Sequence, residues 1–389
     1  MLNFTFSHPT QLVFGLDTIN RVGELSKTLG NKILLHYGQS SIKKSGLYDK
    51  VMTSLTEAGI EVVELGGVVA NPVFSLVLEG IKLCKEEQIE GILAVGGGSV
   101  MDSAKAIAAG VYVEDDYWNY FMHRGDVPNA LPLGIVSTLP ATGSETSPSS
   151  VITNEAVEHK RSINSKKILP KFSIVDPKLH VTLPAYQTAC GISDIMSHLI
   201  ERYFTHTTHV DYTDRLLEAS FHTLLVNGPL LMKDPNNLDA RSEVAFVSLV
   251  AHNGLLGGGR EEDWASHRIE HELSNYYNIA HGAGLAIIMP AWMRYVYKEN
   301  PARFEQFARR VFKIDYAFDQ QEQTIVAGID AYEKFLSDLY LPTSLTEAGI
   351  LEDNFEQMTD NALINRGETV GNFKKLNKQD IINIYRLSK

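Results

Sequence analysis

The sequence predicts an α/β domain with a parallel sheet over residues 1–178 and an all-helical domain over residues 179–389. Three observations lead to this fold class. Short apolar runs alternate with helical patterns in the first half, as they do in parallel sheets that helices cover on both faces. Strand-like runs nearly disappear after His180, where long stretches with helical spacing begin. Finally, a chain of 389 residues is long enough for about two domains.

In the first half, the predicted elements follow one another in a regular order. Each short apolar run is followed by a stretch whose apolar residues recur at helical spacing. The predicted strands comprise residues 32–37, 61–65, 91–96 and 131–138. The predicted helices comprise residues 46–59, 74–87 and 99–110. This alternation is typical of a doubly wound sheet.

The second half is predicted to be helical almost throughout. Helical spacing is clearest over residues 212–232, 240–256 and 302–314. No linker rich in proline or serine separates the two halves, so we expect them to pack tightly. A cleft between two such domains is a common place for a ligand.

Composition excludes several classes of function. The formal net charge of −12 leaves no electrostatic footprint for nucleic acid or for an anionic membrane surface. Two cysteines, Cys84 and Cys190, are too few for a secreted disulfide framework. The first residues lack the pattern of a signal peptide, and no apolar run reaches the roughly 18 residues of a membrane span. We therefore expect a soluble, cytoplasmic protein without nucleic-acid or membrane partners.

A glycine-rich loop follows the predicted strand 91–96. Gly96, Gly97 and Gly98 allow a ligand to approach the backbone, and the helix that follows offers free N–H groups to an anion such as a pyrophosphate. Ser99 and Asp102 also fit a capping box for this helix. A tight turn with a capped helix is the alternative interpretation, since the usual GxGxxG dinucleotide fingerprint is absent.

Two other loops follow predicted strands and share this expected edge of the sheet. Gly38, Gln39 and Ser40 come after the first predicted strand and are candidates to contact the far end of the same nucleotide. Residues 137–150 form a long loop rich in hydroxyl groups after another strand. An ordinary turn and a solvated loop are the alternatives.

Carboxylate and imidazole groups cluster in the helical half. Asp194 and His198 lie four residues apart in an apolar helical pattern, so they share one face of the predicted helix. His267 and His271 are related in the same way, and His281 stands at the expected start of another helix.

Asp194, His198, His267 and His281 offer one oxygen and three nitrogen ligands, a set that suits Fe²⁺ or Zn²⁺. An open coordination position on such an ion would polarise a substrate oxygen. A buried polar network is the alternative. A zincin protease is excluded because the sequence holds no HExxH motif.

Four motifs together resemble those of the iron-containing (group III) alcohol dehydrogenases. They are GGGSVMD (96–102), TLPATGSE (138–145), DIMSH (194–198) and HRIEHELS with IAHGAGLAIIMP (267–290). The likeness is strongest to the branch of butanol dehydrogenases and NADPH-dependent aldehyde reductases. It implies a Rossmann-like, dinucleotide-binding first domain, a helical second domain, a homodimer, and Asp194, His198, His267 and His281 as the metal ligands.

The resemblance also assigns residues to the cofactor. It implies that Gly97, Gly98 and Ser99 hold the pyrophosphate and that Asp102 lies near the nicotinamide and its ribose. The other residues that it implies as cofactor contacts are Asn71, Thr138, Leu139, Thr142 and Lys160. His271 is the candidate for proton relay or substrate contact, with support of the metal ligands as the alternative. Water or a ribose hydroxyl is another possible proton source.

The choice between NAD and NADP depends on position 39. Members that prefer NAD often carry an acidic residue near this position, which accepts from the ribose 2′-hydroxyl and repels a 2′-phosphate. Here the residue is Gln39, with Ser40 and Lys43 nearby. We therefore expect NADP(H) to be slightly favoured over NAD(H), although similar chains more often carry a glycine here and the larger glutamine side chain would crowd the phosphate.

The expected activity is hydride transfer between NAD(P)H and a primary alcohol or aldehyde, such as butanol or butanal. Two other enzymes remain as alternatives: a lyase similar to dehydroquinate synthase and a polyol oxidoreductase similar to glycerol dehydrogenase. A non-catalytic metal- or nucleotide-binding protein is a third. In the expected homodimer, residues 4–15 are a candidate strand that pairs across the interface.

Overall fold

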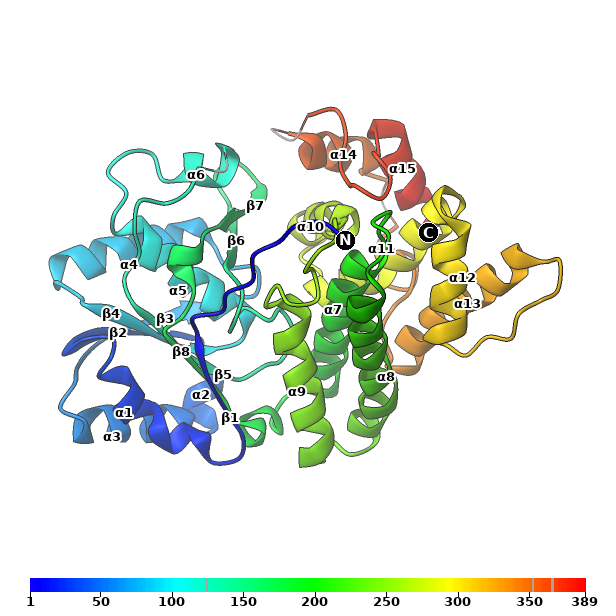
Figure 1. Cartoon of the computed structure of the whole chain (residues 1–389). Coiled ribbons are helices and arrows are strands. Elements are labelled where there is room, and N and C mark those ends of the chain that lie inside the picture. The colour runs from blue at the N-terminus through cyan, green and yellow to red at the C-terminus, as the bar shows by residue number, and fades with distance from the viewer. Residues whose placement is uncertain (124, 352, 365–366) are drawn as a thin grey trace. The chain divides into compact units, whose positions relative to one another are not determined.

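The structure is a computed structural model of the chain, and it describes residues 1–123, 125–351, 353–364 and 367–389. The described residues divide into two compact units (Figure 1). The α/β unit comprises Ser7–Leu183, and the helical unit comprises Met1–Phe6 together with Pro184–Lys389. The predicted fold class, a parallel-sheet α/β domain followed by a helical one, is confirmed.

The α/β unit is built on a six-stranded sheet in which every neighbouring pair is parallel. In sheet order its strands are β1 (Gln11–Phe14), β8 (Phe172–Val175), β5 (Leu133–Ser137), β4 (Gly91–Gly96), β2 (Lys32–Gly38) and β3 (Glu61–Val68). The four strands predicted from apolar runs are all present. Within the region expected to pair with a second copy, Gln11–Phe14 forms a strand that pairs on one side with β8 of its own chain.

Helices cover both faces of this sheet. They are α1 (Val22–Ser26), α2 (Ser41–Lys44), α3 (Leu47–Glu57), α4 (Phe74–Glu86), α5 (Gly98–Gly110) and α6 (Trp118–His123). Because side chains alternate along a strand, Leu34 of β2 packs in the core under α4 and α5, while its neighbours Ile33 and Leu35 pack in the core under α1 and α3. Burial on both faces explains why the strands read as unbroken apolar runs.

A two-stranded antiparallel hairpin was not predicted. It consists of β6 (Ser149–Asn154) and β7 (His159–Asn164), and β6 contacts α5. Its strands are rich in serine and asparagine, so their composition resembles that of a loop. Every second residue of β6 is nevertheless buried, which is the pattern of a strand with one covered face. Short 3₁₀ helices at Thr18–Arg21, Lys166–Ile168 and Pro177–His180 complete the unit.

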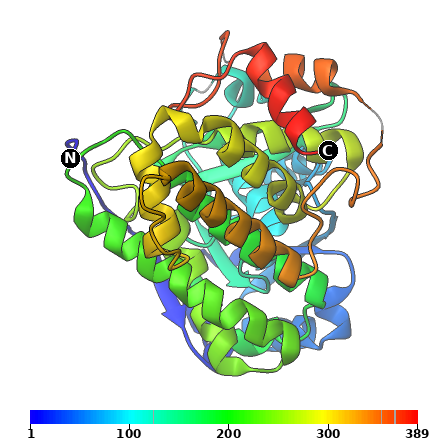
Figure 2. The same ribbon diagram turned by 90° about the vertical axis from the view of Figure 1, so that its right-hand side faces the viewer.

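The helical unit contains nine α-helices within its described residues (Figure 2). They are α7 (Ala185–Tyr203), α8 (Asp211–Lys233), α9 (Leu238–His252), α10 (Ala265–Tyr277), α11 (His281–Val296), α12 (Pro301–Arg310), α13 (Gln321–Asp338), α14 (Phe355–Leu363) and α15 (Lys378–Leu387). A 3₁₀ helix, Tyr297–Glu299, links α11 to α12. Helices α7 and α11 are buried over most of their length and contact each other. Among the described residues, we find no helix that is both long and apolar enough to cross a membrane.

The first six residues belong to the helical unit although they precede the sheet in the sequence. The amino group of Met1 donates to the carbonyl of Thr208 at 2.7 Å, and the Leu2 amide donates to the carbonyl of Gly259 at 2.8 Å. The ring of Phe4 lies against Gly258. This attachment depends on a contact with residues more than 200 positions away, which sequence patterns do not reveal.

Candidate metal centre and nucleotide site

Helix α7 provides the first two groups of the candidate metal centre. Asp194 and His198 are both buried, and Nε2 of His198 lies 3.4 Å from Oδ1 of Asp194. Their separation of four residues puts them one turn apart on one face, as the spacing predicted. Glu201 lies three residues beyond His198 on the same face and is fully buried.

Helices α10 and α11 bring two more imidazoles to the same carboxylate. Nε2 of His267 and Nε2 of His281 each lie 3.8 Å from Oδ1 of Asp194. One ligand atom from each of these three residues lies within 4.8 Å of the others. Two ligands of a tetrahedral ion with bonds near 2.1 Å are separated by about 3.4 Å. The distances from Asp194 to His267 and His281 are therefore close to those that a single ion requires. His198 lies at a similar distance from Asp194 but is not part of this compact group of three.

Two buried glutamates orient the histidines. Oε1 of Glu201 accepts from the backbone amide of His267 at 3.1 Å and lies 2.8 Å from its Nδ1. A carboxylate oxygen of Glu270 contacts Nδ1 of His281 in the same way. In both cases the carboxylate occupies Nδ1 and leaves Nε2 directed at Asp194, an arrangement that is common around metal-ligating histidines. Neither glutamate was predicted from the sequence, although the position of Glu201 on the ligand face of α7 is a signal that could have identified it.

The donor atoms of this cluster fit a metal ion. Oδ1 of Asp194 and Nε2 of His267 are buried, and neither has a hydrogen-bond partner within the described part of the chain. Leaving buried polar atoms unpaired is costly, so such atoms are commonly satisfied by a water or an ion. One carboxylate oxygen and three imidazole nitrogens are also the ligands that Zn²⁺ and Fe²⁺ take in proteins.

The electrostatic environment shifts the pKa values of His198 and His267 in opposite directions. Burial, together with the neighbouring imidazoles of His252 and His267, keeps the pKa of His198 well below its ordinary value. Burial also acts to lower the pKa of His267, but the negative charge of the nearby Asp194 and the hydrogen bond and charge of Glu201 outweigh it and raise that pKa to about 9. His198 is therefore neutral and ready to act as a ligand, whereas metal binding at His267 has to release a proton.

Close helix packing places His281 opposite Asp194. Helix α11 begins at His281, as the histidine before the glycines suggested. A Cβ on Gly282 would overlap the backbone of Cys190 in α7, so only glycine permits this approach. The hydroxyl of Ser193 donates to the carbonyl of Gly282 at 2.7 Å and fixes the two helices together one residue before Asp194.

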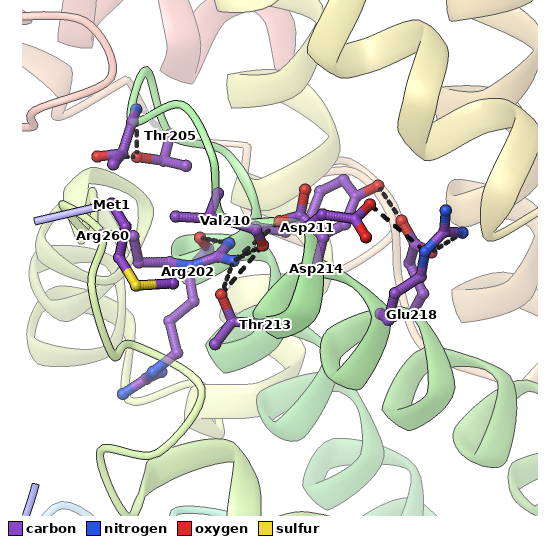
Figure 3. Close-up of polar contacts among 12 residues, drawn as sticks. Met1, Arg202, Thr205, Val210, Asp211, Thr213, Asp214, Glu218 and Arg260 are labelled. Carbon is purple, nitrogen blue, oxygen red and sulfur yellow. Dashed lines mark hydrogen bonds and ion pairs between the residues drawn. The ribbon is translucent and has the colours of Figure 1, made fainter.

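The loop before α10 is held by a buried ion network (Figure 3). The side chain of Arg260 is fully buried and donates to the carbonyls of Arg202 and Val210, to Thr213 Oγ1, and to Asp214 Oδ1 at 2.8 Å. Asp214 also accepts two hydrogen bonds of 2.6 Å from Arg303.

Helix α10 begins a few residues after Arg260. The backbone amide of Trp264, just before the helix, donates to Glu201 at 2.6 Å. The network thus fixes the start of the helix that carries His267.

His271 lies one turn beyond His267 on α10 and is half-buried. Its ring centre is 5.5 Å from that of His281, and it forms a second compact group with Glu270 and His281. His271 therefore lies beside His281, one of the candidate metal ligands.

In the α/β unit, the glycine-rich loop joins β4 to α5. The helix begins at Gly98 with Gly97 as its N-cap residue, and no side chain caps it. The predicted capping box of Ser99 and Asp102 is wrong. The carboxylate of Asp102 instead accepts from Ser144 Oγ at 2.7 Å and from the Val151 amide at 3.0 Å. The Asp102 carboxylate therefore bonds to long-range partners, and no side-chain hydrogen bond caps the N-terminus of α5 in the described residues.

The loop after β5 packs directly on this glycine turn. The amide of Thr138 donates to the carbonyl of Gly96 at 3.0 Å. A Cβ at Gly97 would touch Leu139, and one at Gly98 would overlap Thr142. Glycine is therefore required here by close approach, and the residues of the two loops form one continuous surface at the carboxyl edge of the sheet.

The third loop ends at the same edge. Gly38 closes β2, the strand next to β4, and a Cβ there would lie 3.8 Å from the side chain of Val100 in the first turn of α5. The chain leaves β2 toward β3 and leaves β4 toward β5, so the connections diverge between β2 and β4. Such a switch point is where open α/β sheets bind ligands. Gln39 and Ser40, just beyond, are exposed.

Two predicted cofactor contacts far apart in the sequence meet beside this edge. The buried ammonium of Lys160, on β7, donates to Oδ1 of Asn71 at 3.0 Å. Asn71 has a positive φ of 55°, a conformation that asparagine tolerates better than most residues. The charge of Lys160 also acts on the carboxylate of Asp102. Asn71, Asp102 and Lys160 are thus neighbours.

Comparison with known proteins adds to these observations. The sequence model described as "Iron-containing alcohol dehydrogenase" matches residues 9–177, and the one described as "Fe-containing alcohol dehydrogenase family, C-terminal" matches residues 188–388. A probable NADH-dependent butanol dehydrogenase 1 of Bacillus subtilis (strain 168) is 42% identical, with 100% of both chains covered. An NADPH-dependent aldehyde reductase of Escherichia coli (strain K12) is 36% identical over 90% of each chain. The crystal structure of an NADH-dependent butanol dehydrogenase A from Thermotoga maritima matches with a TM-score of 0.96 and 42% identity, covering 100% of this chain and 99% of that one.

Proposed function

Because the chain belongs to the iron-containing alcohol dehydrogenase family, we propose that it interconverts short aliphatic aldehydes, such as butanal, and the corresponding primary alcohols. The protein is an oxidoreductase that uses a nicotinamide cofactor and a metal, as its family does. Names of relatives with butanol dehydrogenase or aldehyde reductase activity support the substrate class. They also disfavour the lyase and polyol alternatives.

One observation carries the proposal most directly: three imidazole Nε2 atoms surround one oxygen of Asp194 in a buried site. We assign Asp194, His198, His267 and His281 as the ligands of one divalent ion, Fe²⁺ or Zn²⁺. An ion bound there would act as a Lewis acid toward the carbonyl oxygen of the substrate. Glu201 and Glu270 would hold His267 and His281 in the required tautomer and orientation.

The α/β unit supplies the proposed nucleotide site. Gly97, Gly98 and Ser99 present the N-terminus of α5, which no side chain caps in the described residues, to the pyrophosphate, and Thr138, Leu139 and Thr142 form the adjoining wall. Asn71, Lys160 and Asp102 are assigned to the nicotinamide ribose region. A nicotinamide held there supplies or accepts the hydride.

His271 is the proposed proton relay. Its place beside His281 and Glu270 would let it pass a proton toward the substrate oxygen or hold a water that does so. Its half-buried position gives the ring a route to solvent.

Activity with purified protein tests this function. Protein loaded with Fe²⁺ or Zn²⁺ without air should oxidise NADH or NADPH when butanal is added, and a chelator should stop the reaction until metal is restored. A protein that binds metal and nucleotide but oxidises neither cofactor with any aldehyde would refute it. Faster reaction of glycerol with NAD than of butanol would favour the polyol alternative.

We propose that NADP(H) is slightly favoured over NAD(H), because the exposed position after β2 carries the neutral Gln39. Relatives of both kinds, named NADH-dependent and NADPH-dependent, are similar to the chain, so the expected preference is small. Lys43 lies close by, with its ammonium 5.1 Å from the ring centre of Tyr37 and 4.6 Å from that of Tyr48. Its charge would support a 2′-phosphate.

Replacing Gln39 with aspartate should reverse this preference. A carboxylate there would accept from the 2′-hydroxyl of NADH and repel the 2′-phosphate of NADPH. The kcat/KM for NADPH divided by that for NADH should therefore fall by about tenfold or more. The neutral control Gln39→Asn should change the ratio little. Steady-state kinetics with both cofactors measures the effect, and an unchanged ratio in Gln39→Asp would place the 2′ position elsewhere.

We further propose that the protein is a homodimer in the cytoplasm. Met1, Leu2, Phe4 and Phe6 are exposed apolar residues, and within the described residues β1 pairs on one side only. Both features would be covered by a second copy. Light scattering should give about twice the mass of the 43.2 kDa chain. Phe4→Asp should shift the measured mass toward that of one chain. A wild-type mass of one chain would refute the dimer.

The two free, buried cysteines support the proposed reducing compartment, the cytoplasm.

A further inference from the structure

Lys105 is a fully buried lysine in the middle of α5 with no role in the function proposed above. Its ammonium group has four oxygen acceptors within 3.0 Å. These are Ser144 O and Ser144 Oγ, both at 2.7 Å, Ser147 O at 2.8 Å and Ser149 O at 3.0 Å. Lysine is almost never fully buried unless its charge is satisfied. Here one side chain bonds to three residues, two in the loop after β5 and one at the start of β6.

Buried charges of opposite sign accompany this ammonium. Asp102 lies one turn earlier on α5, and Glu145 lies in the loop itself; both are buried. The hydroxyl of Ser144 links the two helical residues, because it accepts from Lys105 and donates to Asp102 at 2.7 Å. Burial lowers the pKa of Lys105 to about 8, although the charges of Asp102 and Glu145 act to raise it.

The segment that Lys105 holds continues directly from the wall of the proposed nucleotide site. Thr142 lies against Gly98 at the first turn of α5. The amide of Ser144 donates to Thr142 Oγ1 at 3.1 Å, so the position of Ser144 determines that of Thr142. Contacts therefore run without a gap from the ammonium of Lys105 to the surface on which the pyrophosphate is proposed to bind.

We propose that Lys105 is a positioning residue for the nicotinamide nucleotide: its ammonium group anchors residues 144–149 and thereby keeps Thr142 against the glycine turn of α5. The inference rests on the proposed function, because it takes this turn to be the pyrophosphate site. A misplacement of about 1 Å in a site wall is enough to weaken binding by one to two orders of magnitude.

The test measures nucleotide binding directly, without aldehyde and without turnover. The fluorescence of NADH or NADPH on binding gives Kd for the full chain carrying Lys105→Met, which keeps the length of the side chain and removes its donors. We expect Kd to rise by about tenfold or more, with the metal content changed less than about twofold.

A matched variant separates positioning from loss of stability. Leu55→Ala truncates a fully buried side chain of α3 in the same unit, and Leu55 packs in the core on the other face of the sheet. Temperatures are chosen at which both variants are folded to the same extent. A purely structural role predicts equal Kd values for the two variants, and that result would overturn the proposal; the proposal predicts that only Lys105→Met binds nucleotide weakly.

A milder change keeps the test decisive where Lys105→Met does not fold. Ser144→Ala removes the hydroxyl that bridges Lys105 and Asp102 while leaving the carbonyl acceptors, and it should raise Kd by about threefold to tenfold. An unchanged Kd in Ser144→Ala would contradict the proposal. Wild-type protein that binds neither dinucleotide would refute the proposed function itself. Equal Kd values for the wild type, Lys105→Met and Ser144→Ala would refute only the role of Lys105.

Discussion

Replacing Asp194 with alanine is expected to remove the bound metal and to lower aldehyde reduction by more than about a thousandfold. Asp194 is the one carboxylate of the proposed ligand set, and its Oδ1 lies 3.4 Å from Nε2 of His198 and 3.8 Å from Nε2 of His267 and of His281. Without it, three neutral imidazoles remain and the charge that balances a divalent ion is lost. Metal analysis of protein purified without air, together with NADH and NADPH oxidation, measures both effects.

An exposed aspartate of the same unit provides the control. Asp239→Ala, near the start of α9, should keep both the metal and the activity. NADH binding should be unchanged in Asp194→Ala, because Asp194 belongs to the helical unit and the proposed nucleotide residues belong to the other. An Asp194→Ala protein that retained metal and turned over at the wild-type rate would end the metal mechanism.

Replacing Asp214 with asparagine is expected to destabilise the helical unit by about 3–5 kcal/mol. Asp214 is buried and accepts from both Arg260 and Arg303. The amide keeps the size of the side chain but leaves two buried guanidinium groups without a counter-charge. Urea denaturation followed by tryptophan fluorescence is a suitable measurement, since Trp264 and Trp292 both lie in this unit.

The same carboxylate makes stability depend on pH. Burial acts to raise the pKa of Asp214, but hydrogen bonds and charge from Arg303, with that of Arg260, outweigh burial and hold it below the ordinary value. Below about pH 4 the unfolded chain therefore takes up this proton before the folded one does, so the stabilisation is present above that pH and lost below it. Asp214→Asn should lack this contribution, and its stability should fall less between about pH 5 and pH 3. Equal slopes in the two proteins would contradict the assignment.

The sheet could be predicted because its strands satisfy a local rule. Residues such as Ile33 and Leu34 face opposite cores, so both must be apolar and the run is visible in the sequence. Helix spacing likewise indicated that Asp194 and His198 share a face. Bringing His267 and His281 to the same point depends on how α7, α10 and α11 pack, and the sequence could only suggest it through residue type and resemblance.

Other features depend on partners distant in the sequence. Ser99 and Asp102 have the spacing of a capping box, but Ser144 and Val151 compete for the Asp102 carboxylate. The polar strand β6 buries every second residue, and it lies beside α5, which is distant from it in the sequence. Lys105 appears in the sequence as an ordinary helical lysine, and its burial follows from the fold of the loop after β5.

The most direct test of the account is the location of the metal itself. Crystals of protein loaded with Fe²⁺ or Zn²⁺ without air can be measured by anomalous scattering at the absorption edge of the metal. We predict one ion within about 2.0–2.3 Å of an oxygen of Asp194 and of a nitrogen of each of His198, His267 and His281. An ion bound elsewhere, or these four side chains farther than bonding distance from a common point in the loaded protein, would contradict the central claim.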